Sequence, residues 1–223
     1  MDAKAFYLKT FQLANHLTEN QLSELCQSFI QKEAKKGQAV YAKGNERRVF
    51  LLVSGKVKVS EINMVGDETI KELIAPGDLF GDVTLQCEGT GSEYAEVISE
   101  RAIYYIISQE QLTALLKANP MLMLDYMGKV GNRFKSLENR YVFMMTQDVK
   151  SRLIYCFKEW AKKEGKTQDG KVIVKNSLTH HDLANLISTS RQTVTVILNE
   201  LKEEGVLNYN RKEFELSPLM LAS

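Results

Sequence analysis

The sequence predicts an α+β fold in three parts: a β-roll with N-terminal helices at residues 1–118, a long helix at 119–145, and a winged helix-turn-helix at 146–223. Three observations predict it. Short β-rich runs separated by turn residues are typical of a sandwich or a closed roll. A continuous apolar heptad pattern indicates a long helix. Two amphipathic helices joined by a three-residue turn indicate a helix-turn-helix.

Composition places the chain among ordinary globular proteins, with 44% hydrophobic and 26% charged residues in 223. It contains no run of about 18 apolar residues, so we expect no membrane span. The N-terminal residues lack the apolar core of a signal peptide, which favours a cytoplasmic protein. Residues 146–223 carry 12 basic and 10 acidic side chains, whereas residues 1–108 carry 12 and 15. This mildly basic C-terminal part permits nucleic-acid binding.

The first 108 residues divide into a helical and a β-rich portion. Leucine and aromatic residues keep helical spacing between Leu8 and Lys35, which predicts short helices. From Gly37 to Ser108 the pattern changes to strands, for which we expect the ranges Gln38–Ala42, Arg48–Ser54, Lys56–Ile62, Thr69–Ala75 and Ala95–Ser108. Residues 109–117 return to a helical pattern.

A long helix follows, and the rest of the chain is organised around it. Asn119 is a suitable N-cap, and Pro120 occupies the first turn, where a helix tolerates proline. Steps of three and four residues then form an apolar seam, which comprises Met123, Met127, Val130, Phe134, Leu137, Tyr141 and Met144. Such a seam indicates either a helix buried in a core or the interface of a parallel dimer, and we favour the dimer.

The C-terminal part contains the predicted helix-turn-helix. An amphipathic helix at 149–163, a polar loop at 164–170 and a strand at 171–175 precede it. Thr179 can cap a helix that begins at His180, the residues 188–190 form a turn, and a second helix runs from Arg191 to Gly205. The runs 206–209 and 213–216 predict a hairpin, or wing. An ordinary helical hairpin is the alternative interpretation.

The second helix of such a motif lies in the major groove of DNA, with its N-terminal residues at the base edges. Arg191 can donate two hydrogen bonds to guanine, Gln192 can pair with adenine, and Val196 offers only apolar contact. Hydroxyl groups nearby suit phosphate contact, although capping or solvent exposure explains each of them as well. We therefore expect a DNA-binding set of Thr189, Ser190, Arg191, Gln192, Thr193, Thr195, Val196 and His180.

Metal, cofactor and catalytic sites find no support in the sequence. The three cysteines, Cys26, Cys87 and Cys156, are far apart and form no CxxC pair, so we expect neither a disulfide framework nor a zinc site. His180 and His181 begin a helix, where a phosphate contact or exposure is favoured over metal binding. The β-rich portion has no histidine, and no Ser-His-Asp or Cys-His arrangement stands out. We expect no enzyme and no cofactor.

Two motifs carry a resemblance that covers nearly the whole chain. These are Pro76-Gly77-Asp78-Leu79-Phe80-Gly81-Asp82 and Ser190-Arg191-Gln192-Thr193-Val194. Placed on either side of the long helix, they resemble the Crp–Fnr superfamily of bacterial transcription regulators. The resemblance implies a cyclic-nucleotide-binding-like β-roll, a homodimer, a palindromic site on double-stranded DNA, and RNA polymerase as a partner.

The predicted effector pocket departs from the cyclic-AMP-binding members of that superfamily. Gly81-Asp82 resembles the first half of their phosphate cassette, but Ser92-Glu93 stands where they have Arg-Ser. No Lys or Arg lies between Lys71 and Arg101 to neutralise a cyclic phosphate. We expect a pocket formed by Gly81, Asp82, Val83, Ser92, Glu93 and Leu137 that binds neither cyclic AMP nor cyclic GMP.

Other inputs known in the superfamily are also poorly matched. An iron–sulfur sensor needs four cysteines, and the sequence has three. A haem sensor needs an axial ligand near the roll, and His16 is the only histidine outside the DNA-binding end. We expect Cys87 to be unreactive, because the neighbouring Asp82 and Glu88 raise a thiol pKa. The effector, and the choice between activator and repressor, stay open. The alternatives are a small-molecule module that controls DNA binding, a nucleotide-binding module without a DNA role, and a metal-dependent enzyme on a β-roll.

Overall fold

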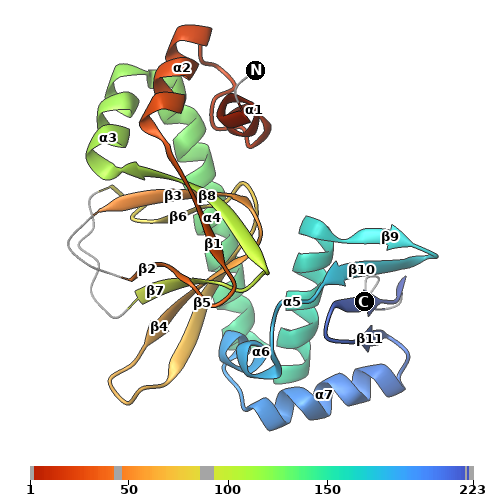
Figure 1. Ribbon diagram of the computed structural model, residues 1–223. Helices are drawn as coiled ribbons and strands as arrows, with labels where there is room; N and C mark the ends of the chain where they lie inside the picture. Colours follow the sequence, from red (N-terminus) through yellow and green to blue (C-terminus); the bar gives the residue numbers. More distant parts are fainter. Residues whose placement is uncertain (1–2, 43–46, 86–92, 219, 221–223) are drawn as a thin grey trace. The chain divides into compact units, whose positions relative to one another are not determined.

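The computed structural model describes residues 3–42, 47–85, 93–218 and 220, and it divides into two compact units, Met1–Glu138 and Asn139–Ser223. The division falls inside the long helix, which is continuous through both units (Figure 1). Among the described residues, no helix is both long and apolar enough to cross a membrane.

The first unit begins with two helices, α1 (Ala3–Thr10) and α2 (Glu19–Ser28). A capping box between Thr18 and Gln21 starts α2. The expected helical region extended to Lys35, and this was wrong for its last part. Residues Ile30–Lys35 form strand β1, which pairs antiparallel with β8 along its whole length. Pairing with a strand some 70 positions later overrides the local helical spacing.

The predicted β-roll is confirmed as two four-stranded antiparallel sheets. One sheet has the order β1-β8-β3-β6 and the other β2-β7-β4-β5. The bounds are β2 (Ala39–Ala42), β3 (Arg48–Ser54), β4 (Val57–Ile62), β5 (Glu68–Ile74), β6 (Leu79–Gly81), β7 (Glu93–Val97) and β8 (Arg101–Ser108). Apolar residues from both sheets, including the stacked rings of Phe50 and Phe80, fill the space between them.

The strands differ from the sequence expectation at two further places. The single run predicted at 95–108 is two strands, because the chain leaves one sheet after Val97 and enters the other at Arg101. The Ser99 hydroxyl donates to the Arg101 carbonyl in the connection. The short strand β6 was not predicted. It pairs with β3, and its Gly81 has φ +80°, where a Cβ would lie 2.7 Å from the Arg48 carbonyl oxygen.

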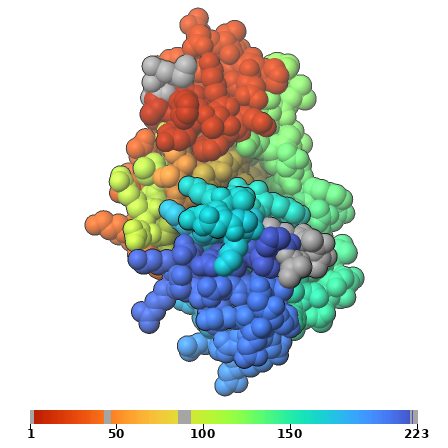
Figure 2. Space-filling view, turned by 90° about the vertical axis from the view of Figure 1, so that its right-hand side faces the viewer, coloured from red at the N-terminus to blue at the C-terminus, as the bar shows by residue number. Residues whose placement is uncertain are grey.

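The first unit is completed by α3 (Gln109–Ala118) and by α4 (Pro120–Thr146) as far as Glu138. The long helix is thus confirmed, although the side chain of Asn119, the expected N-cap, bonds back to α3. The Asn119 carbonyl accepts from Met123 N, whereas its side-chain amide donates back to the Leu115 carbonyl and closes α3. In Figure 2, α1 and α2 (red) cover one end of this unit beside the green of α3 and α4.

The second unit is a winged helix-turn-helix, as predicted. Its helices are α5 (Val149–Glu164), α6 (His180–Ile187) and α7 (Arg191–Glu203). Its sheet has the order β11-β12-β10-β9, with β9 (Lys166–Gln168), β10 (Lys171–Lys175), β11 (Leu207–Tyr209) and β12 (Glu213–Leu216). Strand β9 corrects the expectation of a loop at 164–170, because these polar residues pair with β10 through backbone hydrogen bonds.

Candidate nucleic-acid interface and effector site

The turn between α6 and α7 is built by local hydrogen bonds. Thr179 and Asp182 form a capping box at the start of α6. At its end Ser188 adopts φ +55°, the left-handed conformation that glycine often supplies at a helix C-terminus. Ser190 then caps α7, since its Oγ accepts from Thr193 N at 3.0 Å. The predicted three-residue turn at 188–190 is therefore present.

The two faces of α7 differ sharply. Val194, Ile197, Leu198 and Leu201 are buried in the unit's core. The opposite face carries exposed Arg191, Gln192 and Val196, three of the residues expected to read DNA. Val196 is 55% exposed, although it is an apolar residue in the middle of a helix. Exposed apolar surface next to Arg and Gln suits the base edges of a major groove.

The hydroxyl groups expected to contact phosphate differ from these three exposed residues, because they take part in contacts within the motif. The Ser190 and Thr193 hydroxyls are 2.8 Å apart within the helix cap, and Thr189 is half-buried in the turn. The Thr195 hydroxyl donates to the Arg191 carbonyl and lies 2.9 Å from His180 Nδ1. Because Thr195 has one hydroxyl proton, His180 Nδ1 is the donor in the second contact. These hydroxyls therefore organise the motif internally.

His180 connects α6 with α7 and with the wing. Its ring centroid lies 5.7 Å from that of Tyr209 on β11. Burial, and then the positive charge of Arg191, lower the pKa of His180 below its usual 6.5. With Nδ1 bonded to Thr195, the second ring nitrogen is the position where a proton is gained at low pH.

Sequence reasoning missed two features of this surface. The Tyr209 hydroxyl donates to Asn199 Oδ1 at 3.2 Å, which joins the wing to the exposed face of α7. Asn199 is exposed and lies seven residues after Gln192, so helical spacing could have placed it on the same face. The wing turn is held by Asn210, whose Oδ1 accepts from Lys212 N and Glu213 N, and it leaves Lys212 exposed.

The expected effector pocket is partly described in the roll. Asp82 N donates to the Arg48 carbonyl, which holds the chain after Gly81 against β3. The Val83 side chain is buried in the core beneath α3 and α4, and its carbonyl accepts from the Tyr126 hydroxyl at 2.6 Å. Leu137 is 38% exposed on α4. Ser92, Glu88 and Cys87 lie outside the described residues.

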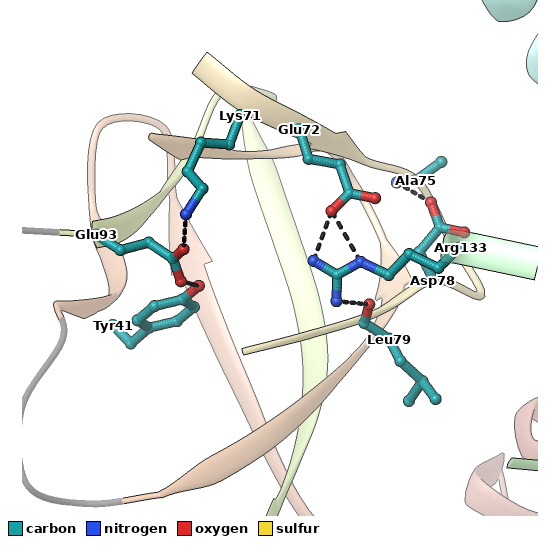
Figure 3. Close-up of polar contacts among 8 residues, drawn as sticks. All are labelled: Tyr41, Lys71, Glu72, Ala75, Asp78, Leu79, Glu93 and Arg133. Carbon is teal, nitrogen blue, oxygen red and sulfur yellow. Dashed lines mark hydrogen bonds and ion pairs between the residues drawn. The ribbon is translucent and has the colours of Figure 1, made fainter. Parts of the chain in front are cut away.

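The negative charge of Glu93 is compensated by Tyr41 and Lys71, which were not among the pocket residues expected from the sequence. Its carboxylate accepts from the Tyr41 hydroxyl at 2.9 Å and from Lys71 Nζ at 2.7 Å (Figure 3). Burial, then Glu93, raises the pKa of Tyr41, and Asp82 raises it further, whereas Arg133 lowers it. The Tyr41 hydroxyl is therefore bonded to Glu93 and is also influenced by the charges of Asp82 and of Arg133, a cation from α4.

That cation, Arg133, forms an ion pair with Glu72 on β5 and also bonds to β6. Its Nε and Nη2 donate to Glu72 Oε2 at 2.9 and 2.6 Å, and Nη1 donates to the Leu79 carbonyl at 3.1 Å (Figure 3). Arg133 is not among the residues of the apolar seam expected on the long helix. Its spacing of seven residues from Tyr126 could have placed it on the face that packs against the roll.

The expected dimer seam lies on another face of α4. Only Leu122 and Tyr126 are buried in this helix. Phe134 and Tyr141 are 68% and 66% exposed, and Met123, Met127 and Leu137 are also exposed. Val130 packs partly against the core beneath α3 and α4, and Met144 is half-buried. The seam is thus largely uncovered within one chain.

Comparisons with known proteins follow the same division. A cyclic nucleotide-binding domain model matches residues 31–119, and a Crp-like helix-turn-helix domain model matches residues 151–217. The cyclic AMP receptor protein of Thermus thermophilus is 26% identical over 186 residues, which cover 82% of each chain. A CRP-like cAMP-activated global transcriptional regulator of Mycobacterium tuberculosis H37Rv is 24% identical over 184 residues, covering 82% and 81%.

Solved structures with the same fold include a cyclic nucleotide-binding domain containing protein from Listeria monocytogenes. It matches with a TM-score of 0.74 at 18% identity, over 96% of this chain and 99% of that one.

Proposed function

This chain belongs to the Crp–Fnr superfamily of DNA-binding transcription regulators, and from that premise we propose that it binds a two-fold symmetric operator as a homodimer without requiring cyclic AMP. The exposed Arg191, Gln192 and Val196 on α7 are the observation that carries the proposal. In a helix-turn-helix dimer, two such helices enter major grooves about 34 Å apart. Each half-site would contain one guanine opposite Arg191 and a base that suits Gln192.

The α4 seam supports a parallel dimer. Its residues repeat at heptad spacing, and the largest of them, Phe134 and Tyr141, are exposed in the single chain. Large apolar side chains at such spacing are stabilised when a second helix covers them. A parallel pair of α4 helices relates two copies by a two-fold axis, which is the symmetry of a palindromic site.

Cyclic AMP is a poor match for the roll. The names of the relatives in Thermus and Mycobacterium refer to cyclic AMP. Where the family resemblance implies Arg-Ser, this chain has Ser92-Glu93, and the nearby cations Lys71 and Arg133 are already paired with Glu93 and Glu72. A cyclic phosphate would have to displace these carboxylates. Calorimetric titration should detect no micromolar binding of cyclic AMP, and a micromolar affinity would contradict this part of the proposal.

The remaining parts of the proposal follow from the family. We propose that the protein acts in the cytoplasm, that RNA polymerase is its partner at promoters, and that it has no catalytic activity. The effector pocket is proposed to include Asp82 and Glu93, with Tyr41 and Arg133 added to the residues expected from the sequence.

Binding of purified, ligand-free protein to a pool of randomised palindromic duplexes at physiological salt tests the function. Enrichment of one symmetric site, with guanine at one position of each half-site, is the expected result. Weak and salt-sensitive binding without enrichment, both alone and with a panel of metabolites, would contradict sequence-specific recognition.

A further inference from the structure

We infer that the effector site of this roll is occupied by the chain's own carboxylate, Glu72, and that its contact with Arg133 replaces a small-molecule ligand. The inference rests on the proposed function, because its consequence is read as DNA binding without a ligand. The site takes a carboxylate, and strand β5 of the same chain supplies it.

The contact has the geometry of a binding site for an anion. Two guanidinium nitrogens of Arg133 converge on one Glu72 oxygen, and a third donates to a backbone carbonyl of β6. The Arg133 and Glu72 side chains are only 21% and 18% exposed. Charge-assisted hydrogen bonds of this kind are shorter and stronger than neutral ones. The arginine is thus engaged from β5 and from β6.

Neighbouring side chains of α4 bind the same segment. Tyr126, Lys129 and Arg133 lie three and four residues apart, on one face of the helix. They donate to the carbonyls of Val83, Gly77 and Leu79 respectively. The Lys129 ammonium group is held against the roll by its bond to the Gly77 carbonyl at 3.1 Å, and this burial lowers its pKa. The segment 77–83, which carries the family motif, is therefore bound to α4 at three points by side chains of the same chain.

The charges around the pair leave little place for an added anion. The Tyr41 hydroxyl bonds to Glu93, which also holds Lys71, and the charges of Asp82 and Arg133 act on it as well. The nearby cations Lys71 and Arg133 are paired with Glu93 and Glu72. An anionic ligand here would meet these carboxylates. Glu72 already provides the negative partner that Arg133 requires.

Removing Glu72 should therefore release α4 from the roll in a way that a ligand can reverse. In the Glu72→Ala variant, Arg133 keeps its charge in a half-buried place without its carboxylate partner, which is unfavourable. If the form in which the roll is bound to α4 falls to about a tenth of the molecules, the apparent DNA affinity falls about tenfold. A small carboxylate that fills the space of the missing side chain should restore it.

The experiment compares ligand-free wild type, Glu72→Ala and Glu33→Ala by fluorescence anisotropy on the selected operator. Glu33 is the matched control, because it pairs with Arg101 on the exposed surface of the same roll. We expect Glu33→Ala to bind as wild type does and Glu72→Ala to bind about tenfold more weakly. Sodium acetate should restore Glu72→Ala binding, whereas sodium chloride at equal ionic strength should not. Glu72→Gln, which preserves the side-chain shape, serves as a second variant if Glu72→Ala unfolds.

The outcomes separate the inference from the proposed function. Wild-type binding only after a small molecule is added would overturn the inference and leave the function intact. Equal affinity of wild type, Glu72→Ala and Glu72→Gln would also overturn it. A weakened Glu72→Ala variant that acetate leaves unchanged would reduce Glu72 to a structural residue, against the inference. Absence of sequence-specific binding by wild type under every condition would instead refute the proposed function.

Discussion

The side-chain oxygen of Asn199 accepts a hydrogen bond from the Tyr209 hydroxyl, so a strand of the wing sets the orientation of an amide on the exposed face of α7. With its oxygen engaged, Asn199 presents its amide hydrogens to an acceptor. On a base edge in the major groove, purine N7 and thymine O4 are such acceptors.

We therefore predict that Asn199→Ala weakens operator binding by about 1 kcal/mol, the net value of one hydrogen bond. Tyr209→Phe should have a smaller effect, because it frees the amide without removing it. In the Asn199→Ala background, Tyr209→Phe should have no further effect on affinity. Anisotropy titrations of the four proteins in this cycle provide the measurement, and additive losses would show that the two residues act separately.

Arg191 and Lys212 should differ in the kind of loss that they cause. Arg191→Ala is expected to cost about 1–3 kcal/mol and to relax one position of each half-site, since a bidentate contact to guanine is lost. Lys212→Ala should weaken binding to all sequences alike and lower the salt slope by about one, as for a phosphate contact. Selection and salt titrations of both variants distinguish these effects. If Arg191→Ala weakened binding to all sequences equally, Arg191 would contact phosphate and not guanine.

DNA binding should strengthen as the pH falls below about 6.5, the usual pKa of histidine. In the free protein the pKa of His180 is lowered by burial and by Arg191, so the ring is largely neutral at that pH. Nearby phosphates favour the protonated ring and raise this pKa, so binding takes up a proton and affinity grows toward lower pH.

Replacing His180 by Asn retains a donor for Thr195 but removes the titration, and should flatten the pH profile of affinity. The His16→Asn variant is the control, because His16 lies in the first unit against Asp125. Its profile should follow the wild type between pH 5 and 8. A wild-type slope in the His180→Asn variant would exclude His180 as the responsible group.

The dimer should depend on Phe134. Replacing this exposed aromatic residue by Asp removes apolar burial worth about 1.5–3 kcal/mol from each copy. Sedimentation equilibrium should then show a dimer dissociation constant raised about a hundredfold or more. Phe6, which is 54% exposed on α1, provides a matched control. Its replacement by Asp should leave the association unchanged, and equal weakening by both variants would contradict a dimer through α4.

The helices and the wing hairpin of the second unit were predictable because their signals are local. Thr179 and Asp182, or Ser190 and Thr193, lie three residues apart, and the buried face of α7 repeats at helical spacing. The strands β3, β10 and β12 also begin and end where the sequence indicates. The prediction of helix for β1 was wrong, because its partner β8 lies far along the chain and its own residues carry no local signal of the pairing.

The sequence by itself determined the α+β class, the extent of the long helix and the residues that α7 exposes, since these follow from periodicity and capping. Only the tertiary structure decided what surrounds the effector site. Arg133 and Glu72 are 61 residues apart, and Tyr41 and Glu93 are 52 apart. A charge that lacks a partner in its own segment can find one on another element, and that pairing depends on how the sheets and α4 pack. The same packing decided which face of α4 binds the roll and which face stays exposed.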